Sequence, residues 1–319
     1  MSEPLHVVFG ATGGAGGALS EELVRQGRRV RGISRKGTEI AGAESVAADA
    51  LDAEQAAAAA EGAAVVYHCV NPGYTQWPEL LPAVSRSILA AAEAAGAKLV
   101  YADNLYAYGP VDGPLREDLP DAATGPKGRT RAEVASELLA AHKAGRVRMT
   151  IGRASDYYGP GGLSSMTGEQ ALGRVVGGGR PVWTGRLDQP HSFQFLPDLA
   201  RALIVLADRD EADGGIWLIP AGEPLTAQRF FDLAFEAAGR RTPAQVQAVS
   251  PALLAIAGLF SPILRELRET AYQFRGPLVV DSSKFDRAFP GLEPTPHPEA
   301  IEQTVRWFKA HRASGRRSH

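Results

Sequence analysis

The sequence contains a single cysteine, Cys69, so a disulfide framework and a cluster of thiolate metal ligands are excluded, and no metal site is expected. Long apolar runs are also missing: the longest, residues 252–260, is too short to cross a bilayer, and no membrane partner is expected. The net charge of −2 leaves no broad basic footprint, so nucleic acid is not an expected partner. The first residues, Met1 to Pro4, lack the charged and apolar regions of a signal peptide, and we expect a cytoplasmic protein.

What the chain does contain is a glycine cluster close to its start. A β-branched, apolar run at residues 6–9 stops at this cluster and a helical pattern follows at once, which predicts a strand, a tight turn and a helix. Gly10 allows the sharp turn, Gly13 the close approach of a pyrophosphate, and Gly16 the close packing of helix on strand. The unpaired N–H groups of the helix start favour phosphate. The dinucleotide-binding residues predicted here are Gly10, Thr12, Gly13, Gly14, Ala15 and Gly16.

The end of the predicted second strand, residues 28–34, bears on the choice of dinucleotide. An acidic side chain there would bind the ribose hydroxyls of NAD, but the sequence has Ser34, Arg35 and Lys36. A hydroxyl and two cations suit the 2′-phosphate of NADP, so we favour NADP as the cofactor, with NAD as the alternative. The alternative without a cofactor contact is that these residues form a solvated basic loop. Asp49 and Ala50, after the next predicted strand, are further cofactor candidates, although Asp49 or Asp52 can instead cap a helix.

Strands and helices alternate through the first half of the chain. Further strands are predicted at residues 45–52, 64–70, 98–102 and 147–152, with helices at 54–61, 82–95 and 132–143. This alternation predicts an α/β, Rossmann-like, doubly wound parallel sheet. We expect a dinucleotide-binding domain at 1–165 and a smaller substrate-binding part at 166–319, in which 198–220 returns to the main sheet and 312–319 forms a disordered tail.

Short motifs follow one another in a fixed order along the chain. They include Asp49-x-x-Asp52, Tyr108-Gly109-Pro110, Arg153 with Asp156-Tyr157-Tyr158-Gly159-Pro160, Pro197-Asp198-Leu199-Ala200 and Trp307-Phe308. Together with the G-x-x-G-x-x-G start, this order resembles the extended short-chain dehydrogenase/reductase superfamily, specifically the NAD-dependent epimerase/dehydratase family. The resemblance implies a Ser or Thr followed by Tyr-x-x-x-Lys, in which the Tyr exchanges a proton with the substrate oxygen during hydride transfer and the Lys holds the nicotinamide ribose.

The sequence departs from this implied catalytic set. Asn104 stands where the hydroxyl residue should be, and the register to Arg153 places Lys127 in the Tyr position and Arg131 in the Lys position. Lys127 and Arg131 are one helical turn apart and share a face. A lysine there can act as a general base, a proton donor or an amine nucleophile, while Arg131 can hydrogen-bond a ribose or carbonyl oxygen. The structural alternative is a pair of solvated cations at an exposed helix start.

Other polar residues are candidates for the same site. Tyr106 can supply the missing phenol, although a wall tyrosine is the more frequent situation. Asn71 and Tyr157 are expected near the substrate, and Asp156 can pair with Lys127 or with a cationic substrate, or cap a helix. His191 can contact substrate, although a surface position is the more frequent one for such a histidine.

The remaining patterns concern the second half and the substrate. Residues 180–184 are expected to pair as a strand with 193–196, a loop is expected at 154–160, and Thr226 is expected to cap a helix. The apolar stretch 251–274 predicts core or a self-association surface, hence a homodimer, and its lack of a basic cluster favours a small or apolar carbonyl or hydroxyl compound over a nucleotide sugar. We expect an NAD(P)-dependent oxidoreductase or epimerase; the alternatives are a non-redox enzyme that uses Lys127 as base or amine, and an inactive dinucleotide sensor.

Overall fold

A seven-stranded sheet forms the centre of the computed structural model, which describes residues 3–249 and 269–315. All neighbouring strands in this sheet are parallel, and their order is β11-β6-β5-β4-β1-β2-β3. The strands are β1 (Leu5–Phe9), β2 (Arg29–Ser34), β3 (Glu44–Ala47), β4 (Ala63–His68), β5 (Lys98–Asn104), β6 (Met149–Ala154) and β11 (Ile216–Leu218). The chain reverses its direction of travel across the sheet between β1 and β4, and open α/β sheets bind ligands at the carboxyl ends of the strands beside such a reversal.

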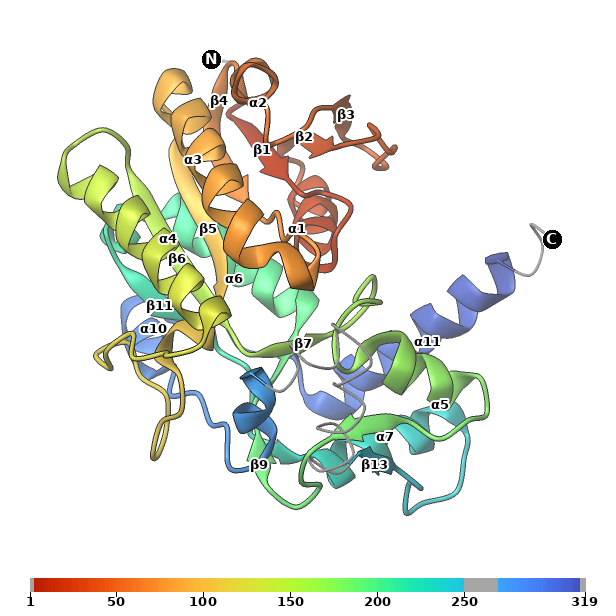
Figure 1. Cartoon of the computed structure of the whole chain (residues 1–319). Coiled ribbons are helices and arrows are strands. Elements are labelled where there is room, and N and C mark those ends of the chain that lie inside the picture. Colours follow the sequence, from red (N-terminus) through yellow and green to blue (C-terminus); the bar gives the residue numbers. More distant parts are fainter. Residues whose placement is uncertain (1–2, 250–268, 316–319) are drawn as a thin grey trace.

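Helices cover both faces of the sheet (Figure 1). One face carries α2 (Ala53–Ala60), α3 (Trp77–Ala95) and α4 (Pro126–Lys143), and the other carries α1 (Gly14–Arg25) and α6 (Leu196–Asp208). Each layer has its own apolar core, because the buried strands present aliphatic side chains to both faces. The predicted Rossmann-like fold is therefore confirmed. Helix α6 packs on this sheet and β11 pairs with β6 at its edge.

The second half of the chain adds three two-stranded sheets and several helices around an aromatic core. The strand pairs are β7 (Asp156–Tyr158) with β10 (Phe193–Phe195), β8 (Val182–Thr184) with β13 (Gln247–Val249), and β9 (Pro190–His191) with β12 (Leu225–Thr226). The helical segments are a π-helical turn (Gly168–Gly173), α5 (Arg174–Val176), α7 (Ala227–Ala238), a 3₁₀ turn η5 (Ala271–Phe274), α10 (Ser283–Ala288) and α11 (His297–Gly315). As predicted, the Thr226 hydroxyl caps α7 by accepting from the Arg229 N–H.

Several predicted boundaries and pairings were wrong. The strand at 180–184 pairs with β13 instead of 193–196, because β10 pairs with β7, which lies inside the predicted loop 154–160. Helix α3 begins at Trp77 instead of residue 82, since Pro78 lies in its first turn, where a missing N–H costs nothing. The predicted disordered tail is helical as far as Gly315, and Arg312 forms an ion pair with Glu169. Most of the apolar stretch 251–274 lies outside the described residues, so the homodimer stays a prediction.

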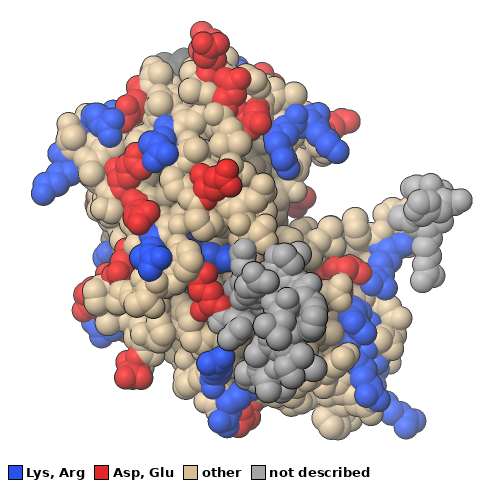
Figure 2. Space-filling model, in the orientation of Figure 1, with Lys and Arg blue, Asp and Glu red and all other residues tan. Residues whose placement is uncertain are grey.

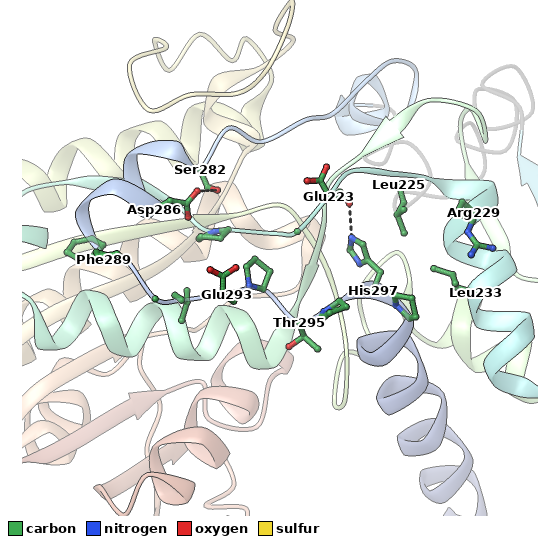
Figure 3. A pocket seen from close by; sticks show the side chains of 18 residues that line it. Glu223, Leu225, Arg229, Leu233, Ser282, Asp286, Phe289, Glu293, Thr295 and His297 are labelled. Atoms are coloured by element: carbon green, nitrogen blue, oxygen red, sulfur yellow. Dashed lines mark hydrogen bonds between the residues drawn. The ribbon is translucent and has the colours of Figure 1, made fainter.

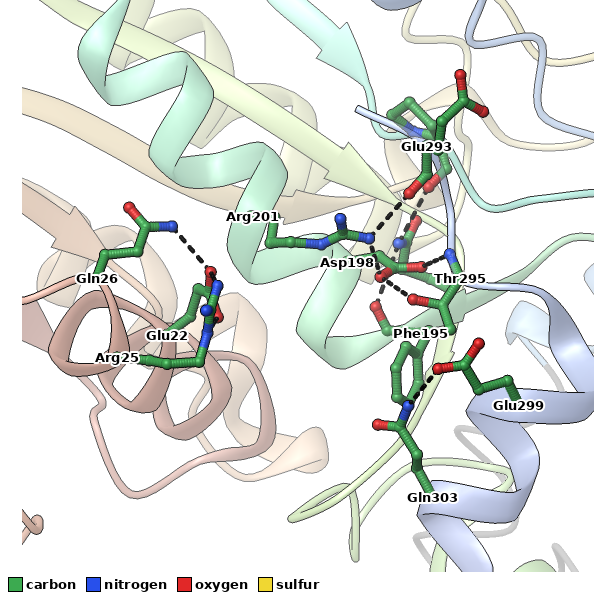
Figure 4. A network of polar contacts seen from close by, with 12 residues as sticks. Glu22, Arg25, Gln26, Phe195, Asp198, Arg201, Glu293, Thr295, Glu299 and Gln303 are labelled. Atoms are coloured by element: carbon green, nitrogen blue, oxygen red, sulfur yellow. Dashed lines mark hydrogen bonds and ion pairs between the residues drawn. The ribbon is translucent and has the colours of Figure 1, made fainter. Parts of the chain in front are cut away.

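A polar network attaches the segment before α11 to the main sheet (Figure 4). Asp198, in the first turn of α6, accepts hydrogen bonds from the N–H and hydroxyl groups of Thr295 at 2.7 and 2.8 Å, and from Arg201 at 2.6 Å. Arg201 also donates to the carbonyl oxygen of Glu293 at 2.9 Å. The buried Asp198 carboxylate thus compensates the N-terminal dipole of α6 and fixes the chain that leads into α11.

Candidate active site

The glycine turn after β1 has the geometry that its sequence predicts. Gly10 has φ +82° and its N–H donates to the carbonyl of Ile33, so the chain turns sharply beside β2. A Cβ on Gly16 would lie 2.2 Å from the carbonyl oxygen of Gly10, which leaves no room for any side chain. Gly16 therefore sets how closely α1 approaches the end of β1.

The start of α1 is open to an anion. No hydrogen bond within the described chain engages the N–H groups of Gly14, Ala15 and Gly16, and the first turn contains no acidic residue. Thr12 and Gly13 are exposed beside these donors. A diphosphate fits these residues, because three N–H groups and the positive end of the helix dipole point out of the sheet edge.

The other cofactor candidates lie in two different environments. Arg35 and Lys36 are exposed just after β2, and within the described ranges neither forms an ion pair, whereas the Ser34 hydroxyl accepts from the Thr38 N–H. Ala50 packs into the core of the helix layer, and the Asp49 carboxylate accepts from the Leu51 N–H. The capping alternative is confirmed for Asp52, which accepts from the N–H groups of Glu54 and Gln55 at the start of α2.

Lys127 and Arg131 are buried in the first turns of α4. Their relative exposures are 2% and 3%, so the alternative of solvated cations at an exposed helix start is wrong. Each cation lies over an aromatic ring: the Lys127 Nζ is 4.5 Å from the centre of Tyr74, and the Arg131 guanidinium is 4.2 Å from the centre of Trp77. Aromatic faces attract cations most strongly where water is excluded, which stabilises both side chains here.

Glu269 contributes a carboxylate to Lys127 from far along the chain. Its Oε1 accepts the backbone N–H of Lys127 at 2.7 Å, and its Oε2 lies 3.6 Å from the Lys127 Nζ. The next residue, Thr270, is hydrogen-bonded to the Tyr74 hydroxyl at 2.7 Å. Burial raises the pKa of Tyr74 to about 12, so Tyr74 is an un-ionised phenol at neutral pH.

Arg131 belongs to a buried network of charges. It donates to the Tyr101 hydroxyl at 2.8 Å, to Asp103 at 3.2 Å and to the Asn71 Oδ1 at 2.7 Å. Asp103 has no exposed side-chain surface and also accepts from Arg153 at 3.1 Å, so one carboxylate bridges two guanidinium groups. The predicted substrate ligand Asn71 therefore uses its amide oxygen to hold Arg131.

The predicted candidates Asn104 and Tyr106, at and just after the end of β5, have structural roles. The Asn104 Oδ1 accepts the Tyr106 N–H at 3.0 Å, which closes the short 3₁₀ turn η2 (Tyr106–Tyr108). The Tyr106 ring packs against Trp77 with ring centres 5.6 Å apart, and burial raises the pKa of Tyr106 well above its ordinary value. Gly128 allows this packing, since a Cβ there would lie 2.6 Å from the Tyr106 carbonyl oxygen.

Asp156 and His191 form a pair that the sequence did not predict. The His191 Nε2 lies 2.9 Å from the Asp156 Oδ2, and His191 is only 3% exposed, so the expected surface position was wrong. Trp183, Phe193 and Phe274 surround the imidazole and leave the carboxylate of Asp156 as its polar partner. Asp156 therefore has His191 as a polar partner. Tyr157, next to it on β7, lies over the glycine turn, within 3.3 Å of where a Gly14 Cβ would be.

A cavity in the described part of the chain lies apart from this cluster. Figure 2 shows Lys, Arg, Asp and Glu interspersed over the sheet-bearing part of the visible face. A cavity of about 860 Å³ is lined by residues of 220–233 and 282–298 (Figure 3), and none of the residues predicted to bind cofactor or substrate lines it. Both ring nitrogens of His297, at its wall, are engaged by Tyr158 and by the Glu223 carbonyl, so this histidine is structural.

Sequence analysis missed four residues of the candidate active site: Tyr74, Trp77, Asp103 and Glu269. Asp103 carried a usable signal, since an acid at the end of a buried strand needs a cationic partner. Tyr74 and Trp77 lie between the predicted strand 64–70 and the predicted helix 82–95, where no element was predicted. Glu269 carried no signal, because 142 residues separate it from Lys127.

The parallel sheet, the glycine turn and the open helix start together define a dinucleotide-dependent α/β enzyme of the short-chain dehydrogenase type. Residues 6–219 match the model of the NAD dependent epimerase/dehydratase family, and the chain belongs to this family. The resemblance seen in its motifs is thus confirmed, and the protein is an enzyme of the epimerase/dehydratase type. No curated protein matches the sequence. Among the described residues, no helix combines the length and apolarity needed to cross a membrane.

Solved structures with low sequence identity share the fold over nearly the whole chain. One is the UDP-N-acetylglucosamine 4-epimerase of Methanobrevibacter ruminantium M1 with UDP-N-acetylmuramic acid (TM-score 0.78, 17% identity, 98% of this chain and 100% of that chain). Another is the dTDP-glucose 4,6-dehydratase DesIV, a double mutant, of Streptomyces venezuelae with NAD and DAU bound (0.77, 17%, 97% and 98%). A third is the Bordetella bronchiseptica enzyme WbmH with NAD+ (0.74, 18%, 97% and 99%).

Proposed function

We propose that the protein is an NADP-dependent oxidoreductase or epimerase-type enzyme for small or apolar carbonyl and hydroxyl compounds, in which Lys127 replaces the usual tyrosine. One observation carries this proposal: the Lys127 ammonium is buried in the first turn of α4, near Glu269 and the Tyr74 ring. The sequence register assigns Lys127 to the position of the family's proton-exchanging residue. A cation at that position can stabilise a developing oxyanion, which hydride transfer to a carbonyl requires.

The nucleotide supplies hydride exchange when bound, and the chain's own residues hold it. The open N–H groups of Gly14, Ala15 and Gly16 would bind its diphosphate. Arg35 and Lys36, exposed without an acidic partner within the described ranges, would bind a 2′-phosphate and favour NADP over NAD. Asp49 and Ala50 remain candidates for contact with the adenine, but only through their backbone. The Asp49 carboxylate is engaged in a turn, and the Ala50 side chain is buried.

Lys127 is the residue to which we assign the proton step. Its Nζ would donate a proton to the substrate oxygen as the carbonyl carbon is reduced, and would recover a proton from water afterwards. Arg131 is a fixed cation beside it, because Asp103, Tyr101 and Asn71 engage its guanidinium. Tyr106 is assigned to the wall, since its raised pKa and its packing on Trp77 suit a neutral aromatic surface.

The side chains around Lys127 support a small or apolar substrate. Tyr74, Trp77 and Tyr106 form a contiguous aromatic surface, and Tyr157 lies over the glycine turn. Burial above all, and the Asp156 charge to a lesser extent, raise the pKa of Tyr74 and Tyr106, so both phenols are neutral and present an aromatic surface. Because similar structures contain nucleotide sugars, these compounds form the second arm of the test.

The test starts with binding. NADPH and NADH are titrated into the protein with fluorescence and melting temperature as readouts, and turnover is then measured with a panel of small aldehydes, ketones and alcohols against a panel of UDP-sugars. We expect tighter binding of NADPH and turnover of the first panel. Lys127→Met is expected to lower kcat by about a hundredfold to ten-thousandfold, while Lys143→Met, at the exposed end of the same helix, keeps it. Binding of neither dinucleotide, or full activity of Lys127→Met, would overturn the proposal.

The ion pair of Lys127 with Glu269 also favours a second candidate, a dinucleotide-binding protein without turnover, because an amine already paired with a carboxylate need not react. The same assays separate the two: binding of NADPH with no turnover of either panel supports the sensor. The non-redox alternative has its own test. Borohydride reduction in the presence of the carbonyl panel traps an imine at Lys127 if the amine is a nucleophile.

A further inference from the structure

We propose that Glu269 is a positioning residue for Lys127: its carboxylate holds the lysine ammonium at the place where the family has its proton-exchanging hydroxyl. This inference rests on the proposed function of Lys127 and adds to it a residue from the opposite end of the chain. Glu269 immediately precedes Thr270 and the turn η5, whereas α4 belongs to the dinucleotide-binding half of the molecule.

The first argument is the number of contacts that one carboxylate makes with one residue. Oε1 accepts the Lys127 backbone N–H at 2.7 Å and Oε2 lies 3.6 Å from its Nζ, so Glu269 contacts both the backbone and the side-chain ammonium of Lys127. The exposed fractions of the two side chains are 19% and 3%. In such a partly dry setting an ion pair is stronger than at the surface, and it restricts where the lysine ammonium can lie.

The second argument is the absence of a side chain where Glu269 approaches. Gly125, the N-cap of α4, offers no capping side chain, and a Cβ on it would lie 2.3 Å from the Glu269 Oε1. Its backbone angles, φ −78° and ψ 156°, are ordinary for any residue, so glycine is not required for conformation. The space at Gly125 is therefore filled by the carboxylate of Glu269, which caps α4 from a distant segment.

The third argument is that the neighbouring residue holds the aromatic ring that lies against the ammonium. Thr270 is hydrogen-bonded to the Tyr74 hydroxyl at 2.7 Å, and the Tyr74 ring lies 4.5 Å from the Lys127 Nζ. The dipeptide Glu269-Thr270 thus places a carboxylate on the ammonium and fixes the ring beneath it. A cation held in this way keeps one geometry relative to the sheet edge, as proton transfer to a bound substrate requires.

The alternative is that Glu269 caps α4 and does nothing for Lys127. Three variants separate the two roles. Glu269→Gln keeps an oxygen for the backbone N–H but removes the charge that faces Nζ. Gly125→Ala leaves Glu269 and Lys127 in the chain but places a methyl group where the carboxylate lies. Gly276→Ala is the matched control, because a Cβ there has no neighbour within 4 Å and its φ lies outside the left-handed region.

Two readouts are used on the full chain. The first is the rate at which Lys127 is reductively methylated by formaldehyde and cyanoborohydride, followed by mass spectrometry of its peptide. The second is kcat and KM in the assay of the proposed function. We expect Glu269→Gln and Gly125→Ala to raise the methylation rate of Lys127 by on the order of tenfold and to lower kcat about tenfold or more, with KM and NADPH affinity nearly unchanged. Gly276→Ala is expected to match the wild type in both.

The outcomes also distinguish the two proposals. If the methylation rate of Lys127 is the same in wild type, Glu269→Gln and Gly125→Ala, Glu269 does not position it and the inference is wrong, whatever the activity. If methylation rises in both variants while the wild type turns over no substrate, the positioning contact stands and the proposed function fails. A variant with lower melting temperature but unchanged kcat and unchanged methylation assigns Glu269 to capping alone and overturns the inference.

Discussion

The glycine turn after β1 and the start of α4 lie at the same edge of the parallel sheet, but they are assembled in different ways. The turn is local: Gly10, Gly16 and the open N–H groups of α1 all lie within seven consecutive residues. The start of α4 is not: its two cations are held by Tyr74, Asp103 and Glu269, which come from three separate segments. The glycine turn, to which we assign the cofactor, is therefore encoded by a short-range sequence pattern, whereas the start of α4, to which we assign the chemistry, depends on tertiary contacts.

The largest effect is expected when the buried network around Arg131 loses its central carboxylate. Asp103 has no exposed side-chain surface and lies between the guanidinium groups of Arg131 and Arg153. Asp103→Asn leaves two buried cations without their shared carboxylate, and we expect a loss of about 3–5 kcal/mol in the free energy of unfolding. Urea denaturation measures it. Asp118→Asn, at a surface ion pair whose carboxylate is 72% exposed, is the control and is expected to change stability by less than about 0.5 kcal/mol. Equal stability of the two variants would show that the buried network is not what holds Arg131.

The next largest effect is expected in the local half. Gly16→Ala would place a methyl group 2.2 Å from the Gly10 carbonyl oxygen, and backbone cannot move aside as a flexible side chain can. We expect a loss of about 1–3 kcal/mol in stability, together with weaker dinucleotide binding. Gly17→Ala is the matched control one residue on: its nearest contact would be an ordinary 3.5 Å, and alanine favours the helix. Thermal melts with and without NADPH compare the two, and a Gly16→Ala protein that binds NADPH normally would contradict the role given to this turn.

A third effect concerns the preference for NADPH over NADH and is expected to leave the fold unchanged. Arg35 and Lys36 are exposed after β2. The double change Arg35→Ser and Lys36→Ser is expected to raise the Kd for NADPH by about tenfold to a hundredfold, because charge-assisted contacts to a phosphate are lost, and to leave NADH binding unchanged. Arg29→Ser, at the exposed opposite end of the same strand, is the control. An equal loss for both dinucleotides would mean that these cations do not read the 2′-phosphate.

The same contrast explains which features could be predicted from the sequence. The sheet, the helix caps at Asp52 and Thr226 and the glycine turn depend on periodicity and on residues a few positions apart, and these predictions were confirmed. That Lys127 and Arg131 share one helical face followed from their spacing of four, but their burial did not. Their partners Tyr74, Asp103 and Glu269 could not be predicted, because these residues are brought to the two cations only by the tertiary fold.

The pairing of Asp156 with His191 shows the limit most clearly. Asp156 belongs to a motif shared with the family, and the role of each of the two residues was predicted from its adjacent sequence alone. The structure instead brings β7 and β9 together, so that aromatic residues bury the histidine and leave a carboxylate as its polar partner. Residue type alone could not indicate this, because a histidine more often lies at the surface and becomes stable in the core only with a polar partner that the sequence does not reveal.

A fourth effect, seen only at acidic pH, concerns a residue that lies between the two regions. His68, at the end of β4, is fully buried beside Tyr101, and its Nε2 lies 2.9 Å from the Ser85 hydroxyl. Burial, and then the charge of Arg131, lower the pKa of His68 from 6.5 to about 3. Above pH 6.5 the histidine is neutral in both the folded and the unfolded chain, so it contributes no pH dependence there. As the pH falls below 6.5, the unfolded chain binds a proton that the folded chain does not, and stability decreases by about 1.4 kcal/mol per pH unit.

Replacing this histidine isolates its contribution from that of the titrating carboxylates. His68→Gln is expected to remove about 2–3 kcal/mol of the stability that the wild type loses between pH 6.5 and 4.5, as measured by urea denaturation at each pH. His311→Gln, at an exposed position of α11, is the control and is expected to keep the wild-type dependence. Since burial also lowers the pKa of His6 and His297, a smaller dependence of the same sign remains in His68→Gln. An unchanged dependence in His68→Gln would mean that protons reach the buried imidazole in the folded state, and that the core between the glycine turn and α4 is less closed than its packing indicates.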